Sequence, residues 1–162
     1  MVINNDLIIS GSDNLISFGK LRVVKGTIWA TENKNLKDFG KLKKVLGKLI
    51  VYDNPNLQFI ENLEYVGEDL NLSECINLET LGNLETIEGY LVLHNCRKLK
   101  SLGNLEFVGD ILNLCQCISL NDLSNLKRVI NTIYLKDSGI TPEYIKKYKP
   151  DLYENCNWNK TL

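Results

Sequence analysis

A repeat of twenty-one residues runs through most of this chain and constrains its fold more than any other feature. The two clearest copies, 82–102 and 103–123, are adjacent, and both begin with Gly-Asn-Leu-Glu. The same frame fits, without a gap, the repeats 19–39, 40–60, 61–81 and 124–141, and its last part fits 1–18. A fixed period of this length is typical of a solenoid, in which each repeat forms one coil and stacks on the next.

Positions 10 and 12 of the repeat predict a β-strand. They are apolar in every coil, as at Leu91 and Leu93, and they alternate with the variable positions 9, 11 and 13. This alternation is the period of a half-buried strand. We therefore expect one strand per coil, stacked into a parallel sheet of seven strands. Positions 18, 21, 3 and 6 are also apolar, but β-branched residues at position 6 and nearby glycines disfavour a helix, so we expect extended or short 3₁₀ segments there.

Position 15 follows the strand and predicts an inward turn. It is occupied by small or polar residues: Ser12, Asn33, Asn54, Cys75, Cys96, Cys117 and Ser138. Such side chains can hydrogen-bond backbone groups that enter the core. Asparagines recur two residues later, as at Asn35 and Asn56, and suit a left-handed or turn conformation.

The two ends of the chain interrupt the repeat, and we expect a single domain, 1–162. Residues 1–18 form a partial N-terminal coil, 19–141 form six repeats with the last truncated, and 142–162 form a C-terminal cap and tail. Thr141, Pro142 and Glu143 predict the start of a helix that runs to about Lys149. The N-terminal end has less apolar cover, and its open strand edge suits a weak homodimer.

The repeat resembles the strand segment of leucine-rich repeats, on the pattern Leu-x-Leu-x-x-Cys at 91–96 and 112–117. The continuation, Leu-x-x-Leu at 99–102, together with 84–93, is more similar to the receptor L-domain variant. Over residues 5–141 the resemblance implies a right-handed β-helical solenoid and a role in binding. A uniform repeat length and the lack of a disulfide framework argue against an actual receptor ectodomain.

Composition narrows the classes of partner. The net charge is −1, which exerts no global pull toward nucleic acid or membrane. Residues 19–48 carry nine Lys or Arg against two acidic residues, and 61–110 carry three against ten acidic residues. We expect weak pairs between neighbouring coils, such as Lys43 with Glu64, and no nucleic-acid site. Five cysteines without a framework indicate a reducing compartment, the cytoplasm, and no signal peptide or membrane span is recognised.

The outward positions of the strands carry more apolar surface than solubility requires, which predicts an interface. Position 11 reads Ile8, Trp29, Ile50, Asn71, Val92, Asn113 and Tyr134. The predicted binding residues on this face are Trp29, Ile50, Tyr52, Tyr90, Val92, His94 and Tyr134. We expect a protein partner and no cofactor or metal ion. The alternative is a carbohydrate or small ligand that stacks on Trp29, Tyr52 and Tyr134.

A third alternative is a hydrolase-type enzyme with a cysteine and a histidine. Ser73, His94 and Cys115 occupy position 13 of successive coils, so an exposed Cys115 lies one coil from the only histidine. No orienting carboxylate and no oxyanion hole are evident. Cys115 and Cys117 point to opposite faces of a strand, which disfavours a metal site with His94. We therefore expect a protein that is not an enzyme.

Overall fold

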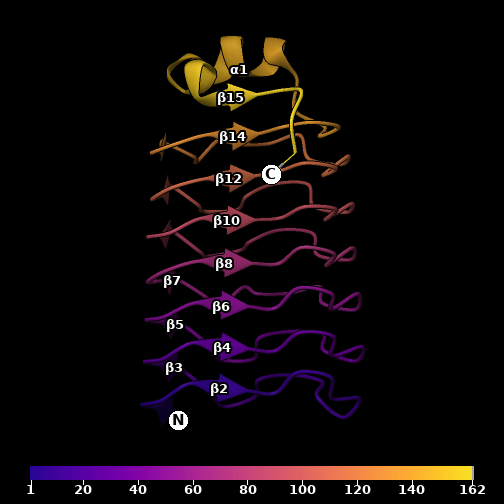
Figure 1. The fold of residues 1–162 in the computed structure, drawn as a ribbon, viewed down its shortest axis with the longest axis vertical. Helices are drawn as coiled ribbons and strands as arrows, with labels where there is room; N and C mark the ends of the chain where they lie inside the picture. Colours follow the sequence, from indigo (N-terminus) through magenta and orange to yellow (C-terminus); the bar gives the residue numbers. More distant parts are fainter. Residues whose placement is uncertain (162) are drawn as a thin grey trace.

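The computed structural model describes residues 1–161 and is a parallel β-solenoid of about seven coils (Figure 1). Each coil supplies one short strand to each of two parallel sheets. The first sheet, sheet A, contains β1 (Val2–Ile3), β3 (Val23–Val24), β5 (Lys44–Val45), β7 (Tyr65–Val66), β9 (Thr86–Ile87), β11 (Phe107–Val108) and β13 (Arg128–Val129). The second, sheet B, contains β2 (Leu7–Ile8), β4 (Ile28–Trp29), β6 (Leu49–Ile50), β8 (Leu70–Asn71), β10 (Leu91–Val92), β12 (Leu112–Asn113), β14 (Ile133–Tyr134) and β15 (Cys156–Asn157).

The strand predicted from positions 10 and 12 is confirmed as sheet B, where it covers positions 10 and 11, and its register follows the repeat. Leu91 pairs with Leu112, twenty-one residues later, and Val92 pairs with Asn113. Sheet A was predicted only as extended chain, and it is a second continuous sheet. On the third side of the coils the chain forms no continuous sheet among the described residues. Neighbouring coils pair there only at isolated β-bridges, such as Ser17 with Asp38 and Thr80 with Ser101.

The core is a set of apolar columns between the two sheets. Each column stacks the same repeat position, as in Leu70, Leu91 and Leu112, which are fully buried. Burying a leucine side chain stabilises the fold by about 1.5–3 kcal/mol relative to exposing it. Because adjacent coils place like side chains on one another, each coil buries its apolar face only against its neighbours.

The corner after sheet B contains one residue in the left-handed region in every coil. These residues occupy position 14: Gly11, Glu32, Asp53, Glu74, Asn95, Gln116 and Asp137. The turn conformation predicted for the asparagines at position 17 is confirmed, and their side chains also bridge neighbouring coils. Asn35 and Asn56 each donate a 2.8 Å side-chain hydrogen bond to a backbone carbonyl of the preceding coil.

The small residues at position 15 from Asn33 to Cys117 form a buried ladder, as predicted, and Ser12 and Ser138 at its two ends are partly buried. Asn54 donates from Nδ2 to the carbonyl of Ala30 at 2.9 Å, twenty-four residues earlier. The thiol of Cys75 makes the equivalent contact with the carbonyl of Val51 at 3.4 Å. Asn54 and Cys75 thus satisfy equivalent inward carbonyls, which explains why either residue type can occupy this position, although Nδ2 of Asn33 has no hydrogen-bond partner in the described chain.

One glycine shows how closely the coils approach. A Cβ on Gly109 would lie 1.9 Å from the backbone oxygen of Glu88 in the preceding coil. No side chain fits at that distance, so glycine is required there for the coils to stack.

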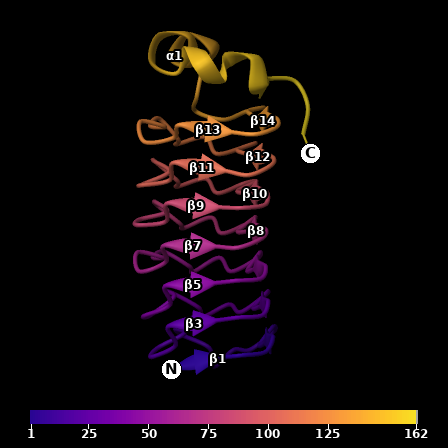
Figure 2. The same ribbon diagram turned by 90° about the vertical axis from the view of Figure 1, so that its left-hand side faces the viewer.

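The C-terminal end of the stack is covered by α1 (Pro142–Tyr148) and the 3₁₀ helix Pro150–Asn155 (Figure 2). The predicted cap is confirmed, because Thr141 Oγ1 accepts a hydrogen bond from the Tyr144 amide and Ile145 is fully buried. After the 3₁₀ helix the chain adds β15 to sheet B, beside β14. This eighth strand was not predicted.

The N-terminal end has no such cover among residues 1–161 (Figure 2). Strands β1 and β2 are the edges of their sheets. The apolar side chains of the first coil, including Ile3, Leu7 and Leu15, are only partly buried, whereas those of the middle coils are fully buried.

Candidate functional site

The candidate site is the outer face of sheet B, defined here as positions 9, 11 and 13 of the coils from β2 to β14. Side chains at positions 10 and 12 point into the core, so those at 9, 11 and 13 point away from it. Strand pairing places equal positions one above another: Trp29 pairs with Ile50, and Asn113 pairs with Tyr134. The outer face is therefore a set of straight ladders on a rigid sheet.

The part of this face near the N-terminus is an apolar cluster of Trp29, Ile50 and Tyr52. Trp29 is 37% exposed and Tyr52 is 38% exposed, on neighbouring coils. Ile8, one coil further out, is 73% exposed. The sequence predicted this cluster, and no described element covers it.

The middle of the face is an open depression of about 540 Å³. It is lined by Asn71, Ser73, Tyr90, Val92, His94, Asn113 and Thr161. Asn71 Oδ1 accepts the amide of Ser73 at 3.0 Å, and Asn113 Oδ1 accepts the amide of Cys115 at 3.0 Å. These two bonds hold the backbone beyond each strand, so the depression has an ordered floor.

A buried carboxylate supports one side of the depression. Asp69 is nearly buried, its Oδ2 lies 2.7 Å from Lys48 Nζ, and its Oδ1 accepts the amide of Tyr90 at 3.2 Å. The hydrogen bond and the charge of Asp69 raise the pKa of Lys48. Partial burial, followed by the charge of Asp69, raises the pKa of the Tyr90 phenol, so this side chain is neutral at physiological pH.

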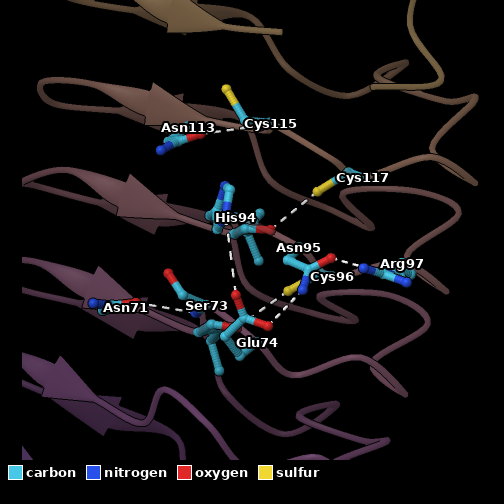
Figure 3. Close-up of polar contacts among 12 residues, drawn as sticks. Asn71, Ser73, Glu74, His94, Asn95, Cys96, Arg97, Asn113, Cys115 and Cys117 are labelled. Atoms are coloured by element: carbon cyan, nitrogen blue, oxygen red, sulfur yellow. Dashed lines mark hydrogen bonds and ion pairs between the residues drawn. The ribbon is translucent and has the colours of Figure 1, made fainter. Parts of the chain in front are cut away.

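The only histidine faces an acidic side chain at the corner of the sheet (Figure 3). His94 Nε2 lies 3.9 Å from Glu74 Oε1 in the preceding coil. Glu74 Oε2 accepts a 2.5 Å hydrogen bond from Asn95 Nδ2, and Asn95 Oδ1 accepts from Arg97 Nε at 2.6 Å. These contacts join two coils and orient His94 along the edge of the depression.

Cys115 corrects one prediction. Position 13 does point outward, but Cys115 is fully buried rather than exposed, because the C-terminal segment lies over it. Its Sγ donates a 3.6 Å hydrogen bond to the carbonyl of Lys160 and points away from His94 (Figure 3). His94 instead faces Glu74. This arrangement does not favour a nucleophile and its base.

The structure divides six of the predicted binding residues into two groups and places Tyr134 outside both. Trp29, Ile50 and Tyr52 form the apolar cluster, and Tyr90, Val92 and His94 border the depression. Tyr134 lies beside the C-terminal strand β15, where it pairs with Asn157. Sequence reasoning missed the polar floor and Thr161. Asparagine at position 11 signals the floor residues Asn71 and Asn113, but no repeat signal locates Thr161.

Ion pairs form between neighbouring coils, as predicted. Lys43 Nζ lies 2.5 Å from Glu64 Oε1, and Lys127 pairs with Glu106 at 2.8 Å. The hydrogen bond from Lys43 lowers the pKa of Glu64. These partly exposed pairs neutralise part of the basic and acidic stripes at the back of the coils.

Within residues 1–161, no cluster of three or more histidine, cysteine or acidic side chains has the geometry of a metal site. None of the described helices is long and apolar enough to cross a membrane. Comparison with models of protein families, with curated proteins and with solved structures finds no match to this chain.

Proposed function

We propose that this protein is a non-enzymatic binding module that engages a protein partner through the outer face of sheet B. The observation that carries the proposal is the cluster of Trp29, Ile50 and Tyr52, which the rest of the described chain leaves uncovered on a rigid sheet. Exposed apolar clusters of this kind mark interfaces, and aromatic anchors tend to dominate interface energies.

Two further features support a binding role. The core is continuous and filled by side chains of the repeat itself, so the fold needs no cofactor for its stability. We also propose that the repeat is related to leucine-rich repeats of the L-domain type, and this relationship supports a binding role by analogy. None of the five cysteines forms a disulfide, which supports a reducing compartment, and we propose the cytoplasm.

The geometry is less favourable to the carbohydrate alternative. Trp29 and Tyr52 lie on adjacent coils, but Tyr134 lies five strand spacings from Trp29, or about 24 Å. The three aromatic rings therefore cannot stack on one small sugar. A broad protein surface can contact both the apolar cluster and the depression.

The test is affinity capture from a lysate of the source organism, with the wild-type protein and matched variants. The double variant Trp29→Ala, Tyr52→Ala removes the apolar anchors. Glu85→Lys changes an exposed residue at the back of the coil and serves as the control. We expect Glu85→Lys to retain the captured protein, and the double variant to lose it by at least tenfold with its melting temperature nearly unchanged.

Two outcomes would contradict the proposal. The first is a partner that binds the double variant as strongly as the wild type, which would place the interface elsewhere. The second is a Trp29→Ala variant that has a much lower melting temperature but, below that temperature, still captures the partner. This result would make Trp29 a structural residue.

A further inference from the structure

The C-terminal segment Asn157–Thr161 lies on the outer face of sheet B and shows what kind of ligand this face accepts. We propose that the face binds an extended peptide that crosses the strands, and that the chain's own C-terminal segment is the occupant in the isolated molecule. This inference deepens the proposed function and rests on it for the identity of the face, although its test is independent.

The first support is burial at equivalent positions. In the coil of β12, Asn113 is 3% exposed and Cys115 is fully buried. The same positions in the two preceding coils, including Val92 and His94, are partly exposed. The contact from Cys115 Sγ to the carbonyl of Lys160 shows that the C-terminal segment covers Cys115. Burial alone does not identify this cover, because Thr31, at the same position in the coil of β4, is 7% exposed without it.

The second support is the path of the segment. From β15 the chain runs down the face past β14 to the level of β12 (Figure 1). Asn157 Oδ1 accepts the amides of Asn159 at 3.2 Å and Lys160 at 3.1 Å, which turns the chain out of the strand direction. Lys160 then contacts Cys115, and Thr161 borders the depression. The path from β15 to the level of β12 covers two strand spacings, or about 10 Å.

The third support is that the segment is exposed beyond Trp158. Asn159, Lys160 and Thr161 are exposed, whereas Trp158 is partly buried against the core cluster. The contact from the Cys115 thiol to the Lys160 carbonyl is long, at 3.6 Å, and a thiol is a weak donor. The last residues can therefore leave the face while Trp158 and β15 stay in place.

The rest of the face defines the partner. From the level of β12 to that of β4 the ladders cross four strand spacings, or about 19 Å, which matches about six extended residues. The upper part offers Ser73, Tyr90 and His94, and the lower part offers Trp29 and Tyr52. A peptide that fits is polar where it crosses the depression and apolar where it reaches the cluster.

Cys115 supplies a built-in probe of this occupancy. The experiment labels the folded, full-length protein with N-ethylmaleimide and maps the modified cysteines by mass spectrometry. Asn157→Ala removes the acceptor that turns the segment, and Asn159→Ala is a matched control on an exposed side chain. Cys117, in the same coil but inside the core, reports unfolding. We expect Cys115 to react at least tenfold faster in Asn157→Ala than in the wild type or the control, with Cys117 unchanged.

The second arm adds a synthetic peptide of residues 156–162, with serine in place of cysteine, to the Asn157→Ala variant. We expect the peptide to restore protection of Cys115 in a saturable manner, and a scrambled peptide to leave it reactive. If Cys115 reacts no faster in Asn157→Ala than in the wild type, the claim that the C-terminal segment is a displaceable cover of Cys115 is wrong. Failure of the peptide to protect, or equal protection by the scrambled peptide, would overturn the peptide-binding claim. Neither result depends on Trp29 or Tyr52, so either is distinguishable from failure of the proposed function.

Discussion

The thiol of Cys96 donates a 3.1 Å hydrogen bond to the backbone carbonyl of Leu72, twenty-four residues earlier in the preceding coil. Cys117 makes the same bond with Leu93 at 3.0 Å, and Asn54 makes it with Ala30 at 2.9 Å. In the four coils that contain Asn54, Cys75, Cys96 and Cys117, one inward carbonyl is thus satisfied by either of two chemically different side chains. This equivalence makes the ladder a sensitive place to test the fold.

Replacing Cys96 by asparagine should be tolerated. Asparagine can reach the same carbonyl, as Asn54 does, so we expect the free energy of unfolding to change by less than about 1 kcal/mol. Leucine cannot make this bond and overfills the turn, so Cys96→Leu should lower the free energy of unfolding by about 1–3 kcal/mol. Urea denaturation of the two variants measures the difference. Equal losses in both variants would contradict the assignment of position 15 to a polar inward turn.

The same ladder predicts a loss of stability at alkaline pH. Burial raises the pKa of Cys75 and of Cys117 from an ordinary 9.0 to about 12, and raises that of Cys96 well above its ordinary value. Above pH 9 the unfolded chain has released these protons while the folded chain retains them, so the free energy of unfolding falls as pH rises toward about 12. Each thiol contributes about 1.4 kcal/mol per pH unit in this window.

Cys117→Ser separates this effect from the titration of lysine and tyrosine. Serine occurs at the same position, at Ser12 and Ser138, and does not titrate there. We expect thermal melts between pH 8 and pH 11 to show a shallower pH dependence in Cys117→Ser than in the wild type. An identical dependence would show that the Cys117 thiol is not kept protonated by the fold.

The left-handed corner predicts a stabilising substitution. Glu32 has φ of 58° and is exposed, and the same position is held by Gly11 at 67° and Asn95 at 60°. Asparagine tolerates this conformation better than glutamate. Glu32→Asn should therefore raise the free energy of unfolding by about 0.5–1 kcal/mol. Glu85→Gln removes a charge elsewhere and should have a smaller effect; if the two variants gain equally, charge rather than backbone conformation is responsible.

The repeat predicted the parts of the fold in which equivalent positions carry equivalent side chains. Leu91 and Leu112 show this for sheet B, and Cys96 and Cys117 show it for the ladder. Sheet A was harder to predict because only one of its two positions is uniform. Val45 and Val66 point inward, but the residues before them are Lys44 and Tyr65, so no alternation marks a strand.

The left-handed residue at the corner and the path of the tail over Cys115 were not predicted, for different physical reasons. Left-handed residues such as Glu32 and Asp53 have no glycine to signal them, and backbone contacts between coils impose the conformation. The cover of Cys115 depends on residues that follow the last repeat and have no counterpart in it. The outward direction of Cys115 was correct, but burial by Lys160 required the path of the chain beyond β15.

The N-terminal coil should be the least stable part of the solenoid. Phe18 stacks on Phe39 with ring centroids 5.0 Å apart, but Leu7 and Leu15 are only partly buried. Coils are stabilised by neighbours on both sides, and within the described chain this coil has a neighbour on one side only. Amide hydrogen exchange should therefore be faster in 1–18 than in 82–123.

A homodimer formed through the N-terminal end would slow amide exchange in the first coil and so reverse this expectation. Two molecules related by a two-fold axis can pair the edge strand β2 with its symmetry mate and so protect both first coils. Light scattering measures this directly, and Ile8→Lys places a charge on the edge strand with no loss of core packing, because Ile8 is exposed. If the first coil exchanges slowly in a dimer, Ile8→Lys should yield a monomer in which it exchanges quickly. A monomeric wild type with a protected first coil would contradict both versions, because neither an open end nor a paired one would then account for its stability.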